Sequence, residues 1–277
     1  MNLFMRLKDG KTKALTFSYD DCKITDKKLV DILDRYSLKG TFNINSGRLW
    51  PDETNASDKN NDVMTISEAK ELYKNSVHEV ACHGVTHSCM EYLRGQDVVA
   101  EFNNDRHDLE KIFGGIIRGM AYPFGNHSDK IVNAAREAGI LYSRTCKSTE
   151  YFDIPSDFLR FHPTCHHNHP KLMNLAEKFV NSTPAWGICW LFSVWGHSAE
   201  FEDKKNWNVI EEFAEYISCK DDIWYATNIE VFEYLAAFYS LVSSVDNHTV
   251  YNPSGIDVWF EADNKVYKIC SGETINI

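Results

Sequence analysis

Two adjacent carboxylates and two histidines follow apolar segments in this chain. Asp20 and Asp21 close the run Ala14–Tyr19, and His83 and His87 stand four residues apart just after a second apolar run. One carboxylate and two imidazoles are a common ligand set for a divalent metal that keeps open positions for water and substrate. The second carboxylate would then lie beside the metal, where it could serve as a general base.

Short apolar runs alternate with helical patterns along most of the chain. We expect strands at 13–18, 40–45, 78–82, 119–122, 141–145, 158–163, 187–195 and 223–227, and helices at 25–36, 67–74, 95–113, 128–138, 170–181, 209–218 and 229–244. This alternation predicts an α/β fold in which a parallel sheet closes into a barrel. Chemistry in such barrels lies where strands end, and Asp20, Asp21, His83, His87, Pro123–Gly125 and His197 all follow expected strand ends.

The pattern changes after residue 245. Apolar segments at 258–260 and 266–269 flank Asp263 and Asn264, which predicts a β-hairpin. We therefore expect a barrel over residues 1–245 and a β-strand appendage over 246–277 that packs on it.

Composition narrows the classes of function. The 277 residues are 43% hydrophobic and 25% charged, as in ordinary globular proteins, and the net charge of −11 argues against nucleic-acid binding. No apolar stretch approaches the roughly 20 residues of a membrane span. The eight cysteines are scattered without a CxxC motif, and the first residues do not resemble a signal peptide, so we expect a cytoplasmic protein, or a secreted one if a leader has been removed.

Four segments resemble the motifs of a known family. Phe17–Asp21 is similar to the "T-F-D-D" first motif of the polysaccharide deacetylases, the NodB-homology or carbohydrate esterase family 4 proteins. His83–His87 resembles their "H-[ST]-x-x-H" motif, and Ala121–Gly125 resembles "R-x-P-[YF]-G". Ser193–His197 stands where the last motif would end in a functional histidine. The resemblance extends over about residues 12–235 and implies a distorted (β/α)7-type barrel, here with a small C-terminal β extension.

The resemblance also implies roles for individual residues. Asp21, His83 and His87 would bind a divalent metal, usually Zn²⁺, with Co²⁺, Ni²⁺ or Mn²⁺ as alternatives. Asp20 would be the general base that activates water, and His197 the general acid that protonates the leaving amine or alcohol.

The implied reaction removes acetyl groups from an N-acetylated sugar or glycan, or from an O-acetylated one. Tyr122 and Phe124, in the third motif, are candidates for substrate or oxyanion contacts. Trp195 is a candidate wall for stacking a sugar ring. Two alternatives remain: a related amidase that cleaves a non-sugar C–N bond, and a catalytically impaired carbohydrate-binding homologue. Substrate choice is expected to depend on the loops 46–64 and 147–157.

The chain departs from the family pattern in three places. Cys22 replaces the glycine that follows the acidic pair. Ala121 stands where the third motif has an arginine that orients the catalytic aspartate. Arg118 and Arg144 could replace that arginine, and we expect Arg144 to do so. The fourth motif is not recognisable.

A histidine-rich segment, 161–169, lies where the fourth motif would fall. His162 and His166 have H-x-x-x-H spacing, so they could form a second metal site. Alternatively, His166 or His167 reaches the mouth of the active site as a substrate contact or second acid, or the segment is a polar surface loop.

Overall fold

A curled parallel sheet lies at the centre of the computed structural model, which describes residues 2–52 and 62–277. The strands are β1 Phe4–Arg6, β2 Lys13–Asp20, β3 Gly40–Ile44, β4 Glu79–Cys82, β5 Gly119–Ala121, β6 Tyr142–Arg144, β7 Cys165–His166, β8 Trp190–Gly196, β9 Ile223–Tyr225, β10 Val242–Ser243, β11 Thr249–Tyr251, β12 Val258–Ala262, β13 Lys265–Ile269 and β14 Thr274–Asn276. The helices are α1 Asp26–Arg35, α2 Ile66–Tyr73, α3 Gly95–Phe113, α4 Asp129–Glu137, α5 Leu172–Asn181, α6 Ala199–Asp203, α7 Asn208–Ile217 and α8 Asn228–Tyr239.

The sheet order β6-β5-β4-β3-β2-β8-β7, with β9 also paired to β2, confirms the predicted α/β barrel. All eight residues of β2 are buried, because strands pair on both of its edges and helices cover its faces. Asp20, the last residue of β2, pairs with Asn43 of β3. The acidic pair therefore leaves the sheet at the carboxyl end of a central strand.

One expected strand is largely absent from the sheet. Residues 158–163 were expected to be extended, but Phe158–Arg160 form a 3-10 turn that the Asp157 side chain caps. Phe161 then pairs with β6, and the short strand β7 pairs with β8. Segment 161–166 therefore crosses from one edge strand to the other, which closes the barrel with only a few hydrogen bonds and explains its distortion.

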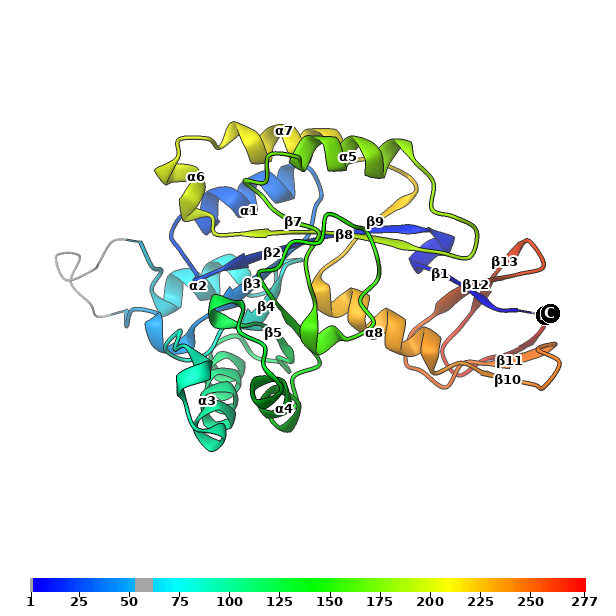
Figure 1. The fold of residues 1–277 in the computed structure, drawn as a ribbon, viewed down its shortest axis with the longest axis horizontal. Coiled ribbons are helices and arrows are strands. Elements are labelled where there is room, and N and C mark those ends of the chain that lie inside the picture. The colour runs from blue at the N-terminus through cyan, green and yellow to red at the C-terminus, as the bar shows by residue number, and fades with distance from the viewer. Residues whose placement is uncertain (1, 53–61) are drawn as a thin grey trace.

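Helices cover the sheet in two groups (Figure 1). Helices α1, α5 and α7 lie along one side, whereas α2, α3 and α4 lie on the other. Two of the helices, α2 and α8, begin with capping boxes in which Thr65 pairs with Glu68 and Thr227 with Glu230, so their first turns satisfy their own backbone donors. Among the described residues, no helix is long and apolar enough to cross a bilayer, and all eight cysteines are free thiols.

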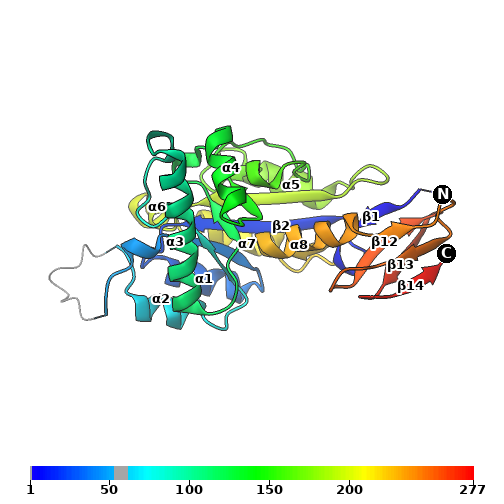
Figure 2. The same cartoon turned by 90° about the horizontal axis from the view of Figure 1, so that it is seen from below.

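The far end of the molecule is built from both ends of the chain (Figure 2). Strand β1 pairs antiparallel with β12, which pairs with β13, and β10, β11 and β14 form a second small sheet. These sheets contain Phe4–Arg6 and Val242–Ser243, which lie outside the expected boundary of 246–277. The division of the chain into two domains stays a prediction, but its smaller part recruits a strand from the N-terminus.

Candidate active site

The three expected metal ligands lie together. Asp21 follows β2, and His83 and His87 follow β4. The Asp21 Oδ1 atom is 4.0 Å from His83 Nε2 and 3.9 Å from His87 Nε2, and the three ligand atoms all lie within 4.8 Å of one another. Both Asp21 and His87 have left-handed backbones, with φ values of 81° and 59°. Such conformations are uncommon without glycine and recur at functional sites, where they direct side chains inward.

The hydrogen bonds of these residues fit a bound cation. His83 Nδ1 lies 2.7 Å from the Ala121 carbonyl oxygen and must donate to it, which leaves Nε2 as the nitrogen that faces Asp21. Within residues 2–52 and 62–277, the buried atoms His83 Nε2 and Asp21 Oδ1 have no hydrogen-bond partner, although Arg48 Nη1 lies 3.7 Å from Asp21 Oδ1. Burial, followed by the neighbouring His83, lowers the pKa of His87 and favours its neutral, metal-binding form. A divalent cation would satisfy all three groups.

Asp20 lies beside this triad and is held by Arg144. The Arg144 Nη2 atom donates to both carboxylate oxygens, at 2.6 and 2.5 Å, and both side chains are almost fully buried. Asn43 Nδ2 donates to the same carboxylate at 2.9 Å. Burial alone would raise the pKa of Asp20, but the charges of Arg144, His83 and His197 outweigh it and lower the pKa to about 2. Asp20 is therefore ionised throughout the neutral range.

Arg144 occupies the place of the arginine missing from the third motif. It lies on β6 directly opposite Ala121 of β5 in the parallel register. Its Nε donates to Ser18 Oγ at 3.0 Å, and its guanidinium carbon lies 4.5 Å from the centre of the Trp195 ring. An arginine on the next strand can thus approach Asp20 from the same end of the sheet, as we expected from the sequence.

His197 also lies close to Asp20 and is held by a carboxylate that sequence reasoning missed. Its Nδ1 donates to Glu200 Oε1 at 2.9 Å, while Nε2 is 3.9 Å from Asp20 Oδ2. Burial lowers the pKa of His197, but Glu200, Asp20 and Asp21 outweigh burial, and the net pKa is raised. Glu200 is three residues after His197, in the short helix α6, and an acidic residue at this spacing was the available signal.

The histidine-rich segment divides between two places. His166 Nε2 lies 3.2 Å from Glu200 Oε1, and the buried His167 lies against the Phe201 ring. With Glu200, these two form a second group of close ligand atoms. His162 instead bonds to Thr145 Oγ1 at 2.6 Å, so the expected pairing of His162 with His166 is not among the metal-sized groups of the described residues.

The three aromatic residues expected to contact the substrate, Phe124, Trp195 and Tyr122, differ in how accessible they are to a ligand. Phe124 is 62% exposed and its ring contacts the His87 ring, which places it at the rim of the metal triad. Trp195 is buried between Arg144 and His166, so its ring supports the site from behind rather than offering an open stacking face. Both Tyr122 donors are already used, the hydroxyl by the Leu159 carbonyl and the backbone N–H by the Arg144 carbonyl. Contrary to expectation, Tyr122 therefore has no free donor for an oxyanion.

Two buried residues that sequence reasoning missed support the metal triad. Asp105 accepts hydrogen bonds from the backbone N–H groups of Ser46 and His83, at 2.8 and 2.9 Å. Asn45 Nδ2 donates to the carbonyl oxygens of His83 and Gly84. Both side chains fix the loop that carries the two histidines. An isolated aspartate in a long helix and an asparagine after a strand give no sequence signal of this role.

Similarities to known proteins agree with this geometry. A polysaccharide deacetylase family model matches residues 7–143. No curated protein sequence matches the chain significantly. A putative polysaccharide deacetylase from Mycobacterium smegmatis has a similar structure, with 16% identity and a TM-score of 0.55 over 86% of this chain and 95% of that one.

Two further solved structures resemble the chain. The Xyl-CE4 domain of a multidomain xylanase from the hindgut metagenome of Trinervitermes trinervoides has 16% identity and a TM-score of 0.53, over 82% of this chain and 92% of that one. The match to the Streptococcus pyogenes deacetylase PplD in complex with acetate has 20% identity and a TM-score of 0.44, over 52% of this chain and only 62% of that one. The motifs and the family match lead to one conclusion: the chain belongs to the polysaccharide deacetylase family.

Proposed function

We propose that this protein is a metal-dependent hydrolase that removes acetyl groups from N-acetylated or O-acetylated carbohydrate. The observation that carries the proposal is the Arg144–Asp20 pair, a buried ionised carboxylate beside a triad of metal ligands. A site that only bound metal or sugar would not need this second carboxylate. The pair therefore favours an active hydrolase over a catalytically impaired homologue.

The residues present fit a divalent cation. Asp21, His83 and His87 would hold it, and two imidazoles with one carboxylate favour Zn²⁺, with Co²⁺, Ni²⁺ and Mn²⁺ as alternatives. Such an ion polarises a carbonyl group and lowers the pKa of water in the site, which would compensate for the weak basicity of a carboxylate with a pKa of about 2.

The protein's own groups would divide the proton transfers. Asp20 would accept the proton of the water that attacks the acetyl carbon, since Arg144 and Asn43 hold its oxygens in place. His197 would donate a proton to the leaving nitrogen or oxygen, because Glu200 holds its Nδ1 and raises its pKa, which favours the protonated form. His197 Nε2 lies 3.9 Å from Asp20 Oδ2. This separation is too short for an acetyl group to fit between the two side chains, so the acetyl group would have to lie beside both of them, next to the metal ligands.

Acetate release tests the proposal. Metal-replete protein would be incubated with N-acetylglucosamine oligomers, acetylated xylan and simple acetamides, with an Asp20→Asn variant as the matched control. We expect acetate from at least one acetylated carbohydrate, loss of activity on chelation, and recovery when Zn²⁺ is added. Hydrolysis of the acetamides alone would instead favour the non-sugar amidase, and no hydrolysis at all would contradict the proposal.

A further inference from the structure

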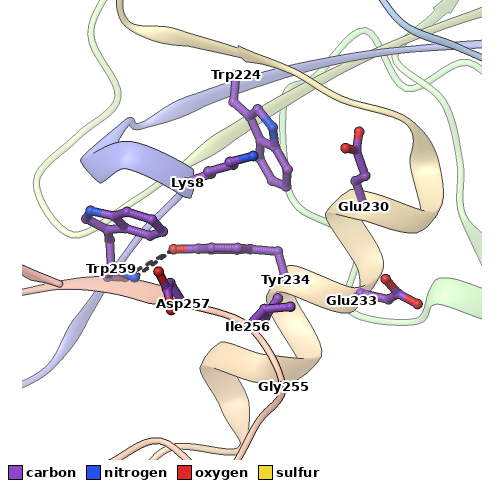
Figure 3. Close-up of a pocket in the computed structure, with 9 residues that line it drawn as sticks. All are labelled: Lys8, Trp224, Glu230, Glu233, Tyr234, Gly255, Ile256, Asp257 and Trp259. Atoms are coloured by element: carbon purple, nitrogen blue, oxygen red, sulfur yellow. Dashed lines mark hydrogen bonds between the residues drawn. The ribbon is translucent and has the colours of Figure 1, made fainter. Parts of the chain in front are cut away.

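A cavity of about 370 Å³ lies at the opposite end of the barrel from the candidate active site (Figure 3). It opens between β9, α8 and the loop that precedes β12. Trp224, which lines it, pairs with Ala14 near the start of β2, whereas Asp20 ends that strand. At about 3.3 Å per residue, the cavity is roughly 20 Å from Asp20. It is therefore separate from the metal triad.

Three aromatic side chains line the cavity: Trp259 is partly exposed and offers an open ring, whereas Trp224 and Tyr234 are only 7% and 3% exposed and hold the cavity wall in place. The Trp224 and Tyr234 rings are 5.3 Å apart, centre to centre. The Tyr234 hydroxyl donates to the Arg6 carbonyl at 2.7 Å and accepts from the Trp259 backbone N–H at 2.8 Å, which ties α8 to β12. Lys268 lies 5.1 Å from the centre of the Trp259 ring and forms an ion pair with Asp257, at 2.7 Å. Little rearrangement of these side chains would be needed to bind a ligand against them.

Two charged groups at the cavity are free. Glu230 and Asp257 are already paired, with Lys39 and Lys268. Glu233 and Lys8 are both exposed, and neither has an ion pair or hydrogen bond among the described residues. Figure 3 shows Glu233 on α8 and Lys8 reaching in from the segment before β2. The cavity thus offers one free carboxylate acceptor and one free ammonium donor beside aromatic walls.

This combination selects a ligand class. Because Lys39 and Lys268 neutralise Glu230 and Asp257, the free charges at the cavity are one carboxylate and one ammonium, and this balance favours neither an anion nor a simple cation. A sugar ring suits both features, because its C–H face can pack on the partly exposed Trp259 ring while its hydroxyls both donate and accept hydrogen bonds. The volume is also within the range of small-molecule sites.

We propose that this cavity binds one pyranose unit of a neutral glycan chain, apart from the catalytic centre. The choice of a glycan rests on the proposed function, since a polymer held here would keep its acetylated units at high local concentration. The site would act as an anchor for long substrates and would take no part in the chemistry.

Calorimetric titration with unacetylated oligosaccharides tests the inference. Hexamers of β-1,4-linked glucose and of β-1,4-linked xylose carry no acetyl group, so binding is measured without turnover. Glu233→Gln and Lys8→Gln change only exposed side chains, and each should weaken binding about tenfold. Trp259→Ala should abolish binding. Tyr239→Ala is the matched control, because Tyr239 is an exposed aromatic residue of α8 outside the cavity, and it should bind normally.

Two results would overturn the inference: failure of both hexamers to bind the unaltered protein at millimolar concentration, or binding that all three cavity variants leave unchanged. Trp259 is partly buried, so its variant needs a folding check, but the glutamate and lysine variants do not depend on it. Acetate release is measured separately, so failure of this inference is distinguishable from failure of the proposed function.

Discussion

The guanidinium of Arg144 binds both carboxylate oxygens of Asp20, although the two residues are 124 positions apart in the chain. The contact exists because β6 places Arg144 opposite Ala121, at the carboxyl end of the same sheet that ends β2 at Asp20. It couples the orientation of the candidate base to the geometry of an edge strand. Changes on β6 should therefore alter chemistry on β2.

Arg144→Lys should lower kcat by about 10²-fold while metal remains bound. A lysine offers one point charge and cannot bond to Asp20, Ser18 and the Thr145 carbonyl together, so the carboxylate would lose its fixed position. Steady-state kinetics with metal analysis measures this. Arg118→Lys is the control: the exposed Arg118 side chain donates to the Gly139 carbonyl and has no other side-chain partner in the part of the chain that the structure describes, so its replacement should leave kcat unchanged. Equal losses in both variants would rule out a specific role for Arg144.

Asp20→Asn should abolish acetate release without removing the metal, because Asn cannot accept the proton from water. It should also destabilise the fold by about 3–5 kcal/mol, since it leaves the fully buried Arg144 without its anionic partner. Chemical denaturation and elemental analysis measure the two effects. Retained turnover would mean that another group is the base.

His83→Ala should lose the bound metal, and Asp105→Asn should weaken metal affinity about 10–100-fold, because Asp105 positions the His83 backbone. His166→Ala is the matched control from the second group of ligand atoms and should retain the metal. Elemental analysis after dialysis separates the cases. Loss of metal from the His166 variant but not from the His83 variant would place the ion at the second group.

Glu200→Gln should shift the alkaline limb of the kcat/KM profile to lower pH. The Glu200 carboxylate raises the pKa of His197, so its neutral replacement would let the acid lose its proton at lower pH. His197→Ala should lower kcat by ~10²–10⁴ below the pKa of His197 and should remove this alkaline limb. The pH–rate profiles of the two variants provide the measurement. A profile for Glu200→Gln that matches the unaltered protein would exclude Glu200 as the residue that sets this pKa.

Glu79→Gln should change how stability depends on pH. Burial raises the pKa of Glu79 to about 7, although Tyr142, Ile229 and Thr41 donate hydrogen bonds to its carboxylate. Since the folded state binds this proton more tightly than the unfolded state, the contribution is fully present below about pH 4.5 and is lost as pH rises toward 7.

The stability advantage of the unaltered protein over Glu79→Gln should therefore shrink between pH 5 and pH 8. Urea unfolding at four pH values measures it. Glu71→Gln, at an exposed position on α2, is the control and should show no such trend. A constant difference between the Glu79 variant and the unaltered protein would contradict the predicted linkage.

Local patterns in the sequence were enough to predict the sheet and much of the site. The apolar run before Asp20 and the alternation of strands and helices give the barrel, and expected helix 95–113 coincides with α3. The expected strand at 158–163 does not form, because the Asp157 side chain caps a 3-10 turn at Phe158–Arg160. The barrel is closed at this point by only a few backbone pairs, such as Phe161 with Arg144, so a full strand is not needed. Strand β1 was not expected, because it has only three residues and its partner strand, β12, lies far along the chain.

Residues that act through folded geometry were harder to find. Arg144 could be inferred, because an arginine at the end of a neighbouring strand can replace one that is missing from the third motif. Asp105 could not be distinguished from a surface acid, and the only signal for Glu200 was its spacing of three residues after His197, since both roles depend on the loops that α3 and α6 approach. The oxyanion contact predicted for Tyr122 was wrong, because a sequence motif does not reveal which hydrogen-bond donors already have partners in the folded protein.

The pairing of β1 with β12 has a consequence for synthesis. Phe4–Arg6 are synthesised more than 250 residues before their partners Trp259–Glu261. Until then the edge of β1 is unpaired and open to association with other strands. We expect nascent chains to need shielding of this segment, and a circular permutant that joins β1 directly to β12 to fold faster than the natural order of segments.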